Sequence, residues 1–287
     1  MPQALAYAQL AGMPAHRGLY AAALPPIAAA FLASSPHLQT GPTALTSLLA
    51  FATLSALAPP GSPEYVELGL LLAVVVGVAR LAIGLLRAGV IAYLMSHAVL
   101  VGFVPAATAL IVASQLPAAL GVAAGDGGIL EEAFDALGDP GAWLAGAVAL
   151  TVATILVVRL SPRLHPMFPG VLVAIVLGML AVEVLGFDGK TVGDVPAGLP
   201  PISFDLPWGD VPSLLLGGSI IALVGFAEPA SVARTLAAKE RQPWDPDREF
   251  VSQGAANVVA GFSGGFPVGG SFSRSALNRM AGGQTRW

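Results

Sequence analysis

The sequence contains no cysteine and very little charge. Lys, Arg, Asp and Glu make up only 10% of its 287 residues, whereas soluble domains usually carry about 25%. The lack of cysteine excludes disulfides, thiol catalysis and cysteine-ligated metals. The four histidines are isolated, so neither a metal centre nor another cofactor is expected. The net charge of -4, without a dense basic tract, argues against nucleic acid as a partner.

Apolar residues and helix-breaking residues are abundant instead. Hydrophobic residues account for 55% of the chain, which also holds 34 glycines and 24 prolines, and the mean hydropathy is +0.78. These values predict an all-α polytopic membrane protein with broken or closely packed helices. The chain opens on an apolar run that reads as the middle of a helix and stops at Arg286-Trp287, so we expect a fragment cut at both ends.

The apolar stretches predict nine spans and the beginning of a tenth, measured against the roughly 20 residues that cross a bilayer. They cover about 1–11 (a half span), 19–33, 41–57, 66–86, 90–116, 142–159, 169–185, 211–227 and 249–262, and the tenth starts near Ser271. Between them, 117–141 is acidic with a surface helix expected at Leu130–Leu137, and 186–210 reads as an exposed loop.

The basic residues agree with this count, because they fall almost entirely on one side if successive loops alternate. Only two, Arg17 and Lys190, fall on the side that holds most of the acids. The other side collects Arg80, Arg87, Arg159, Arg163, Arg234, Lys239, Arg241, Arg248, Arg279 and Arg286. Cytoplasmic loops carry such an excess, so this side is predicted to be the inside.

The segment Gly264–Asn278 stands out because it brings glycines, a proline, three serines and Arg274 into apolar surroundings. Such a sequence favours a break followed by a new helix start, and a helix start is a ready anion site. A plain interhelical loop is the alternative. Thr40–Leu45 has a similar pattern on a span of opposite direction. Two opposed half-helices are typical of an inverted-repeat transporter.

Two charged residues are expected to lie at membrane depth. Arg274, about four residues into the tenth helix, should face a cavity, a partner or an anion, because a central arginine is costly to insert; snorkelling to an interface is the alternative. Glu228 closes the predicted eighth span, where it would bind a coupling H⁺ or Na⁺. The alternative is a carboxylate at the cytoplasmic boundary.

Other polar residues allow two interpretations. Gln3 and Tyr7 are four residues apart and share a helix face, where they line a polar cavity or join neighbouring helices. Thr43 follows Gly41-Pro42 and suits a helix start. Ser273 lacks the Gly-x-Ser-x-Gly surroundings of a hydrolase nucleophile, so an enzyme is not expected.

Four separated motifs together resemble the sulfate permease (SulP) family of anion transporters. They are Pro2-Gln-Ala-Leu-Ala-Tyr-Ala8, Gly18-Leu-Tyr-Ala-Ala22, Ser34-Ser-Pro-His-Leu-Gln-Thr-Gly-Pro-Thr-Ala44 and Gly265-Phe-Pro-Val-Gly-Gly-Ser-Phe-Ser-Arg-Ser-Ala-Leu-Asn278. The resemblance implies fourteen spans in two inverted seven-span repeats. It also implies that this chain lacks the start of span one, spans eleven to fourteen and the cytoplasmic STAS domain.

The resemblance further implies a core subdomain at about 1–87 and 209–287, a gate subdomain at about 88–185 and an extracytoplasmic loop at 186–208. The anion would lie between the starts of the third and tenth helices, with Glu228 as the site of the coupling ion. The implied anion-binding residues are Gln3, Tyr7, Pro42, Thr43, Ser271, Phe272, Ser273 and Arg274.

The function expected from these features is secondary active transport of a small inorganic or carboxylate anion, of the sulfate, bicarbonate or dicarboxylate class. Coupling to H⁺ or Na⁺ and elevator-like alternating access are expected, in a multi-pass protein of the bacterial inner membrane that forms a homodimer when full length. A nucleobase permease of the same fold is one alternative, although Arg274 and the serines favour an anion. An anion channel or voltage-responsive membrane protein is another.

Overall fold

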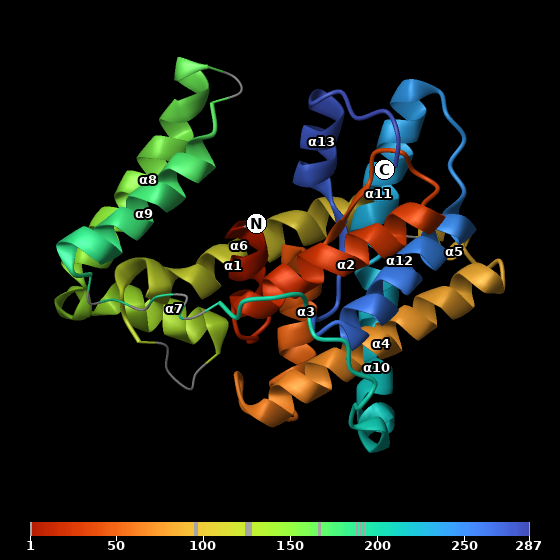
Figure 1. Cartoon of the computed structure of the whole chain (residues 1–287), viewed down its shortest axis with the longest axis horizontal. Helices are drawn as coiled ribbons and strands as arrows, with labels where there is room; N and C mark the ends of the chain where they lie inside the picture. The colour runs from red at the N-terminus through yellow and green to blue at the C-terminus, as the bar shows by residue number, and fades with distance from the viewer. Residues whose placement is uncertain are drawn as a thin grey trace. The chain divides into compact units, whose positions relative to one another are not determined.

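The computed structural model describes residues 2–94, 97–123, 128–165, 168–187, 189, 191, 193 and 195–286. The chain forms two compact units, Met1–Phe103 with Asp194–Trp287, and Val104–Gly193. Both are built from helices, and the described residues add only two short strands (Figure 1). The roles of core and gate that the sequence analysis gave to these parts of the chain stay predictions.

The first unit holds both ends of the chain and most of its helices. Its first part contains α1 (Pro2–Leu10), α2 (His16–Leu32), β1 (Gln39–Gly41), α3 (Ala44–Leu54), α4 (Pro63–Leu85), α5 (Ile91–Leu94) and the start of α6 (His97–Leu120). Its second part contains η2 (Trp208–Asp210), α10 (Val211–Val224), α11 (Ala227–Glu240), α12 (Pro246–Phe262), β2 (Gly269–Ser271) and α13 (Phe272–Met280).

The second unit contains the remainder of α6, α7 (Ile129–Gly138), η1 (Pro140–Ala142), α8 (Ala145–Leu164) and α9 (Gly170–Leu185). α8 packs against α9. The expected surface helix at Leu130–Leu137 is confirmed as α7, which exposes Leu130 and Phe134. No helix or strand is found among the described residues between α9 and η2, as expected for the loop at 186–210, although Lys190 of the charge tally lies outside them.

Helices α4 and α12 form the centre of the first unit and pack closely through glycines. A Cβ at Gly77 of α4 would lie 2.6 Å from the backbone nitrogen of Val258, and one at Gly254 of α12 would lie 2.7 Å from that of Leu81. Small residues let membrane helices approach until their backbones touch. The glycines therefore set the spacing of this pair.

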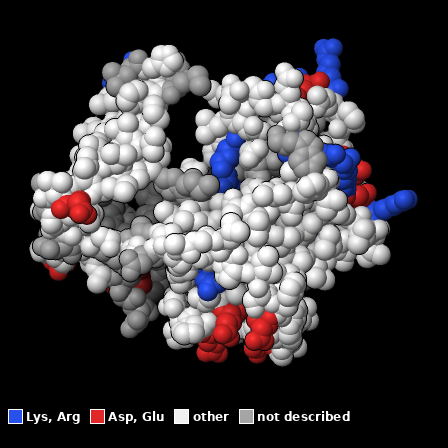
Figure 2. Space-filling model, viewed as in Figure 1, with Lys and Arg blue, Asp and Glu red and all other residues white. Residues whose placement is uncertain are grey.

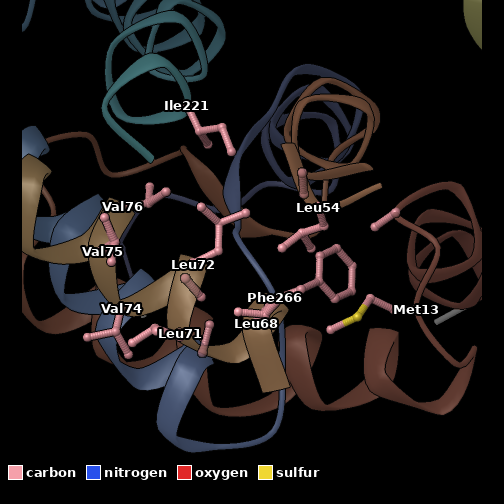
Figure 3. Close-up of a cluster of buried hydrophobic side chains, with 14 of the residues drawn as sticks. Met13, Leu54, Leu68, Leu71, Leu72, Val74, Val75, Val76, Ile221 and Phe266 are labelled. Atoms are coloured by element: carbon pink, nitrogen blue, oxygen red, sulfur yellow. The ribbon is translucent and has the colours of Figure 1, made fainter. Parts of the chain in front are cut away.

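The hydrophobic core surrounds α4. Figure 3 shows the Phe266 ring between the side chains of Met13 and Leu54, next to the leucines and valines of α4. Phe266 is fully buried although it lies in the irregular segment before β2. Burial of about 150–250 Å² of aromatic surface makes such a ring a strong anchor. Phe266 thus fixes the break that precedes α13.

The two strands connect the broken helices. β1 and β2 pair antiparallel, with Gln39 opposite Ser271 and Gly41 opposite Gly269. Because α3 follows β1 and α13 follows β2, the two helices leave opposite ends of this ladder, as Figure 1 shows. The expected pair of opposed half-helices is therefore present at Thr40–Leu45 and after Gly270.

Two expectations about charged residues were wrong. Glu228 does not close the eighth span: α10 ends at Val224, and Glu228 lies in the first turn of α11. The apolar helical stretch continues past this point, because Trp208–Glu240 is one candidate span, as are Pro63–Leu85 and Ala145–Arg163 among the described helices. Arg80, which lies in the predicted fourth span but was counted with the charges of the inner side, is fully buried within α4 and faces no loop.

The remaining charges of the first unit are segregated. Figure 2 shows most Lys and Arg on the side of α11 and α13, some of them beside acidic residues, and a group of acidic residues at the opposite edge, where α4 and α10 start. Arg279 at the end of α13 pairs with Glu240 at the end of α11, at 2.7 Å. Glu64 lies in the first turn of α4, on an exposed part of the chain. This distribution fits the predicted orientation, with the ends of α11 and α13 inside.

Candidate anion site

The start of α3 is capped by Thr43, as the sequence analysis expected. Thr43 has extended backbone angles, and its Oγ1 accepts a hydrogen bond from the Thr46 backbone N–H at 3.4 Å. The Thr43 and Thr46 hydroxyls lie 2.9 Å apart. The first N–H groups of a helix have no intrahelical acceptor, so this start directs N–H groups and a positive dipole end towards the ladder.

The start of α13 is built in the same way. Ser271 ends β2 and caps α13 by accepting from the Arg274 backbone N–H at 3.4 Å. The Ser271 carbonyl accepts from the hydroxyl of Ser275 at 2.6 Å, and that hydroxyl in turn accepts from the Gln39 N–H at 2.9 Å. Ser273 Oγ lies 3.4 Å from Ser271 Oγ. Ser275 therefore ties the α13 start to β1.

Arg274 connects the two helix starts. Its Nη2 donates to the Pro42 carbonyl at 2.8 Å, one residue before the cap of α3. The guanidinium lies against the backbone of Gly41, where a Cβ would be 3.0 Å from Nη1 and where φ is +151°. Glycine is favoured here because L side chains rarely adopt this φ. A cation from α13 is thus held over the start of α3.

Glu228 lies at the other helix start. Its Oε1 accepts from the backbone N–H of Phe272, the first residue of α13, at 3.3 Å. Its charge also interacts with that of Arg274. A carboxylate at a helix N-terminus is stabilised by the dipole. Glu228 therefore occupies a position at α13 that also suits an anion.

The residues of α1 are placed less uniformly. Tyr7 is half-buried and lies within electrostatic range of Arg274 and Glu228, and α1 packs against α3. Gln3 is exposed one turn earlier.

Two other expected residues contribute through their backbone. The Phe272 ring is 63% exposed, so this residue faces the site with its backbone N–H. Pro42 contributes its carbonyl. Seven of the eight expected residues thus gather around the ladder, whereas Gln3 is exposed on α1.

Several residues that support the site were missed by the sequence analysis. The Asn257 side chain of α12 accepts from the Val268 N–H and donates to the Val268 carbonyl, both at 2.9 Å, as a neighbouring strand would. Gln253 donates to the Thr40 hydroxyl at 2.7 Å. Both are fully buried. Their spacing of four residues on one helix face is the signal that could have indicated a polar contact.

Glycines let both α11 and α3 pack closely against the ladder. A Cβ at Gly270 would lie 2.7 Å from Pro229 Cβ, and one at Gly269 would lie 3.1 Å from Thr46. Among the described residues, no group of three or more His, Asp or Glu could hold a metal ion. The chemistry of the site is therefore that of two helix starts, hydroxyls, one guanidinium and one carboxylate.

The whole chain, residues 1–287, matches the model of the Sulfate permease family. The chain belongs to the sulfate permease family. Its relatives are named as transporters rather than as enzymes, and the resemblance drawn from the four motifs is confirmed.

Two curated relatives illustrate the similarity. A probable sulfate transporter of Mycobacterium tuberculosis (strain CDC 1551 / Oshkosh) is 33% identical over 296 residues, which cover 100% of this chain and 52% of the relative. Probable sulfate transporter 4.2 of Arabidopsis thaliana is 34% identical over 288 residues, which cover 97% of this chain and 42% of the relative. The chain spans about half the length of these relatives.

Solved structures of the same fold include the transmembrane domain of BicA, a cyanobacterium bicarbonate transporter. Its TM-score is 0.88 at 25% identity, and the match covers 100% of this chain and 74% of that structure. The murine Slc26a9 anion transporter in the inward-facing state matches with a TM-score of 0.89 at 21% identity, over 99% of this chain and 51% of that structure. The predicted all-α polytopic membrane fold is confirmed.

Proposed function

We propose that this sulfate permease chain forms the anion-binding part of a secondary transporter for small inorganic or carboxylate anions. The observation that carries the proposal is the position of Arg274. Its guanidinium comes from the start of α13 and donates to Pro42 at the start of α3. Two helix dipoles and one full charge therefore favour an anion at the same place.

The site has features that suit transport rather than permanent binding. The Ser271, Ser273 and Thr43 hydroxyls supply directional hydrogen bonds, and Arg274 is the one full positive charge that the site itself contributes. A guanidinium that already donates to a carbonyl binds an anion less strongly than a free one. The anion is thus attracted to the site and can leave it again.

Glu228 supports coupling to a cation. Its ionised carboxylate accepts from the Phe272 N–H at the α13 start, where a bound anion would need the same positive end. Like charges this close disfavour each other. Protonation of Glu228, or Na⁺ bound to it, removes the repulsion, so the cation and the anion bind together. This arrangement is that of a symporter.

The proposed substrate class, oligomeric state and location are suggested by the family. The relatives are named as transporters of sulfate and bicarbonate, and we extend this class, with dicarboxylates, to the present chain. The full-length protein would be a homodimer in the bacterial inner membrane that moves its core past its gate. A nucleobase permease would favour a carboxylate facing the base, whereas Arg274 favours an anion.

Transport is tested with the full-length protein in liposomes. Uptake of labelled sulfate or bicarbonate should saturate, and unlabelled anion inside the vesicles should accelerate it by counterflow. A conductance that does not saturate would instead support an anion channel. Uptake of labelled uracil with no anion uptake would support the nucleobase permease.

A further inference from the structure

Arg80 is a buried cation next to the site, and the proposed function does not use it. It lies on α4 with an exposed fraction of 0%. Its Nε donates to the Ala222 carbonyl at 3.2 Å, Nη2 to the Ile221 carbonyl at 3.1 Å and Nη1 to the Val268 carbonyl at 2.9 Å. Within the described parts of the chain, no carboxylate pairs with it.

The guanidinium lies close behind the two helix starts. Val268 directly precedes β2. A Cβ at Gly225 would lie 2.9 Å from Arg80 Nη2 and 3.4 Å from Thr46 Cγ2. Thr46 belongs to the first turn of α3, and its hydroxyl contacts Thr43. One layer of backbone, at Gly225 and Val268, therefore separates Arg80 from the cap of α3.

Hydrogen bonding alone does not account for an arginine here. Ile221 and Ala222 are in the last turn of α10, and neutral donors can satisfy such carbonyls. The Val268 carbonyl already accepts from the Asn257 amide. Burying an ionised group without a counter-charge is costly, and carbonyl dipoles supply only partial negative charge. A bound anion would provide the missing full charge.

We propose that Arg80 is a second cationic determinant of the anion site, acting through space on the charge of the anion without touching it. This inference rests on the proposed function. Arg274 contacts the helix starts directly, whereas Arg80 adds positive potential from behind them. Because Coulomb energy scales with the charge of the ligand, Arg80 should favour divalent anions over monovalent ones.

The test compares anion charges in the full-length protein. Calorimetric Kd values are measured for sulfate and for formate with the wild type, Arg80→Gln and Arg80→Lys. At a separation on the order of 10 Å and an effective dielectric constant of about 20, one unit charge changes affinity about tenfold per unit of anion charge. Arg80→Gln should therefore weaken formate about tenfold and sulfate about a hundredfold, while Arg80→Lys keeps the ratio of the two within about threefold.

The ratio of the sulfate Kd to the formate Kd distinguishes an electrostatic effect of Arg80 on the anion from a role of Arg80 in folding. A distorted site would weaken both anions by the same factor, and that result, or no change, would overturn the inference. If Arg80→Gln does not fold, Arg80→Met, which also removes the charge, is measured in its place. A sulfate affinity that falls about tenfold more than the formate affinity supports the inference, and an equal loss for both anions overturns it.

Two controls complete the experiment. Arg87→Gln removes the same charge from an exposed position beyond the end of α4 and should leave the ratio unchanged. Arg274→Ala tests the proposed function in the same assay. If the wild type binds neither anion, the proposed function fails. If the wild type and Arg274→Ala behave as proposed and the Arg80→Gln ratio is unchanged, only the role of Arg80 fails.

Discussion

At the scale of single residues, the site depends on charges that face helix starts. Arg274 and Glu228 approach the ladder from different helices, one donating to the start of α3 and the other accepting at the start of α13. Each is near the end of a helix dipole, where charge effects are strongest. Neutralising either one should therefore change a different property of transport.

Glu228→Gln keeps an oxygen that can accept from Phe272 but cannot be ionised. In the wild type, anion binding should weaken as pH rises, because an ionised Glu228 repels the anion. In the variant, affinity should not depend on pH and driven uptake should lose its response to a H⁺ or Na⁺ gradient. The measurement is liposome uptake with and without each gradient.

Glu67→Gln is the matched control for Glu228→Gln, because it makes the same substitution at an exposed position of α4 away from the site. It should retain the response of the wild type. An unaltered dependence on both gradients in Glu228→Gln would exclude Glu228 as the coupling group.

The residues that could be predicted from the sequence were those with local signatures. Thr43 follows Gly41-Pro42 and Ser271 follows Gly269-Gly270, each directly before a helix, so their role as helix caps could be predicted. Glu228 was placed at the wrong helix end because Gly225-Phe226 breaks the span without a strong stop signal. Arg80 was counted with the charges of the inner side because its three carbonyl partners lie far away in the sequence.

At the scale of elements, the break before α13 depends on contacts from α12 and α4. Asn257 and Phe266 hold the irregular segment, and the glycines of the α4–α12 pair set how deep it lies. The sequence analysis found the helices but not this close packing, because isolated glycines are frequent in membrane helices. The partners of a glycine become visible only in three dimensions.

Gly254→Val should destabilise the protein strongly. A Cβ there meets the Leu81 backbone nitrogen at 2.7 Å, and backbone cannot move aside as a side chain can. Overpacking of this kind costs about 1–3 kcal/mol, and a lower midpoint of thermal unfolding in detergent would report it. Gly178→Val in α9, where no atom lies within 4 Å of the added Cβ, should leave the midpoint almost unchanged. Equal midpoints for the two variants would contradict the packing described here.

Ser271→Ala should weaken the start of α13. The variant loses the acceptor of the Arg274 N–H, and loss of an N-cap costs about 1 kcal/mol. Unfolding without anion should occur at lower temperature. Ser273→Ala removes a hydroxyl from the same turn without removing the cap, so it should not lower the unfolding temperature. A larger effect at Ser273 would show that Ser271 is not the cap.

At the scale of the whole molecule, charge distribution predicts how the first unit crosses the bilayer. The ends of α11 and α13 should face the cytoplasm and the start of α4 the outside. The chain has no cysteine, so single cysteines report topology cleanly. Glu64→Cys should react with a membrane-impermeant maleimide applied to intact cells, and Gln242→Cys only after permeabilisation. Both positions are exposed, and the reverse pattern would invert the orientation.

The central claim is that Arg274 and the two opposed helix starts bind an anion. Titration calorimetry of the full-length protein with sulfate, bicarbonate and dicarboxylates, wild type beside Arg274→Ala, tests it most directly. Loss of a charge-assisted contact to the ligand costs about 1.5–3 kcal/mol, so at least one anion should bind the variant about tenfold to a hundredfold more weakly. An affinity that Arg274→Ala leaves unchanged would contradict the claim.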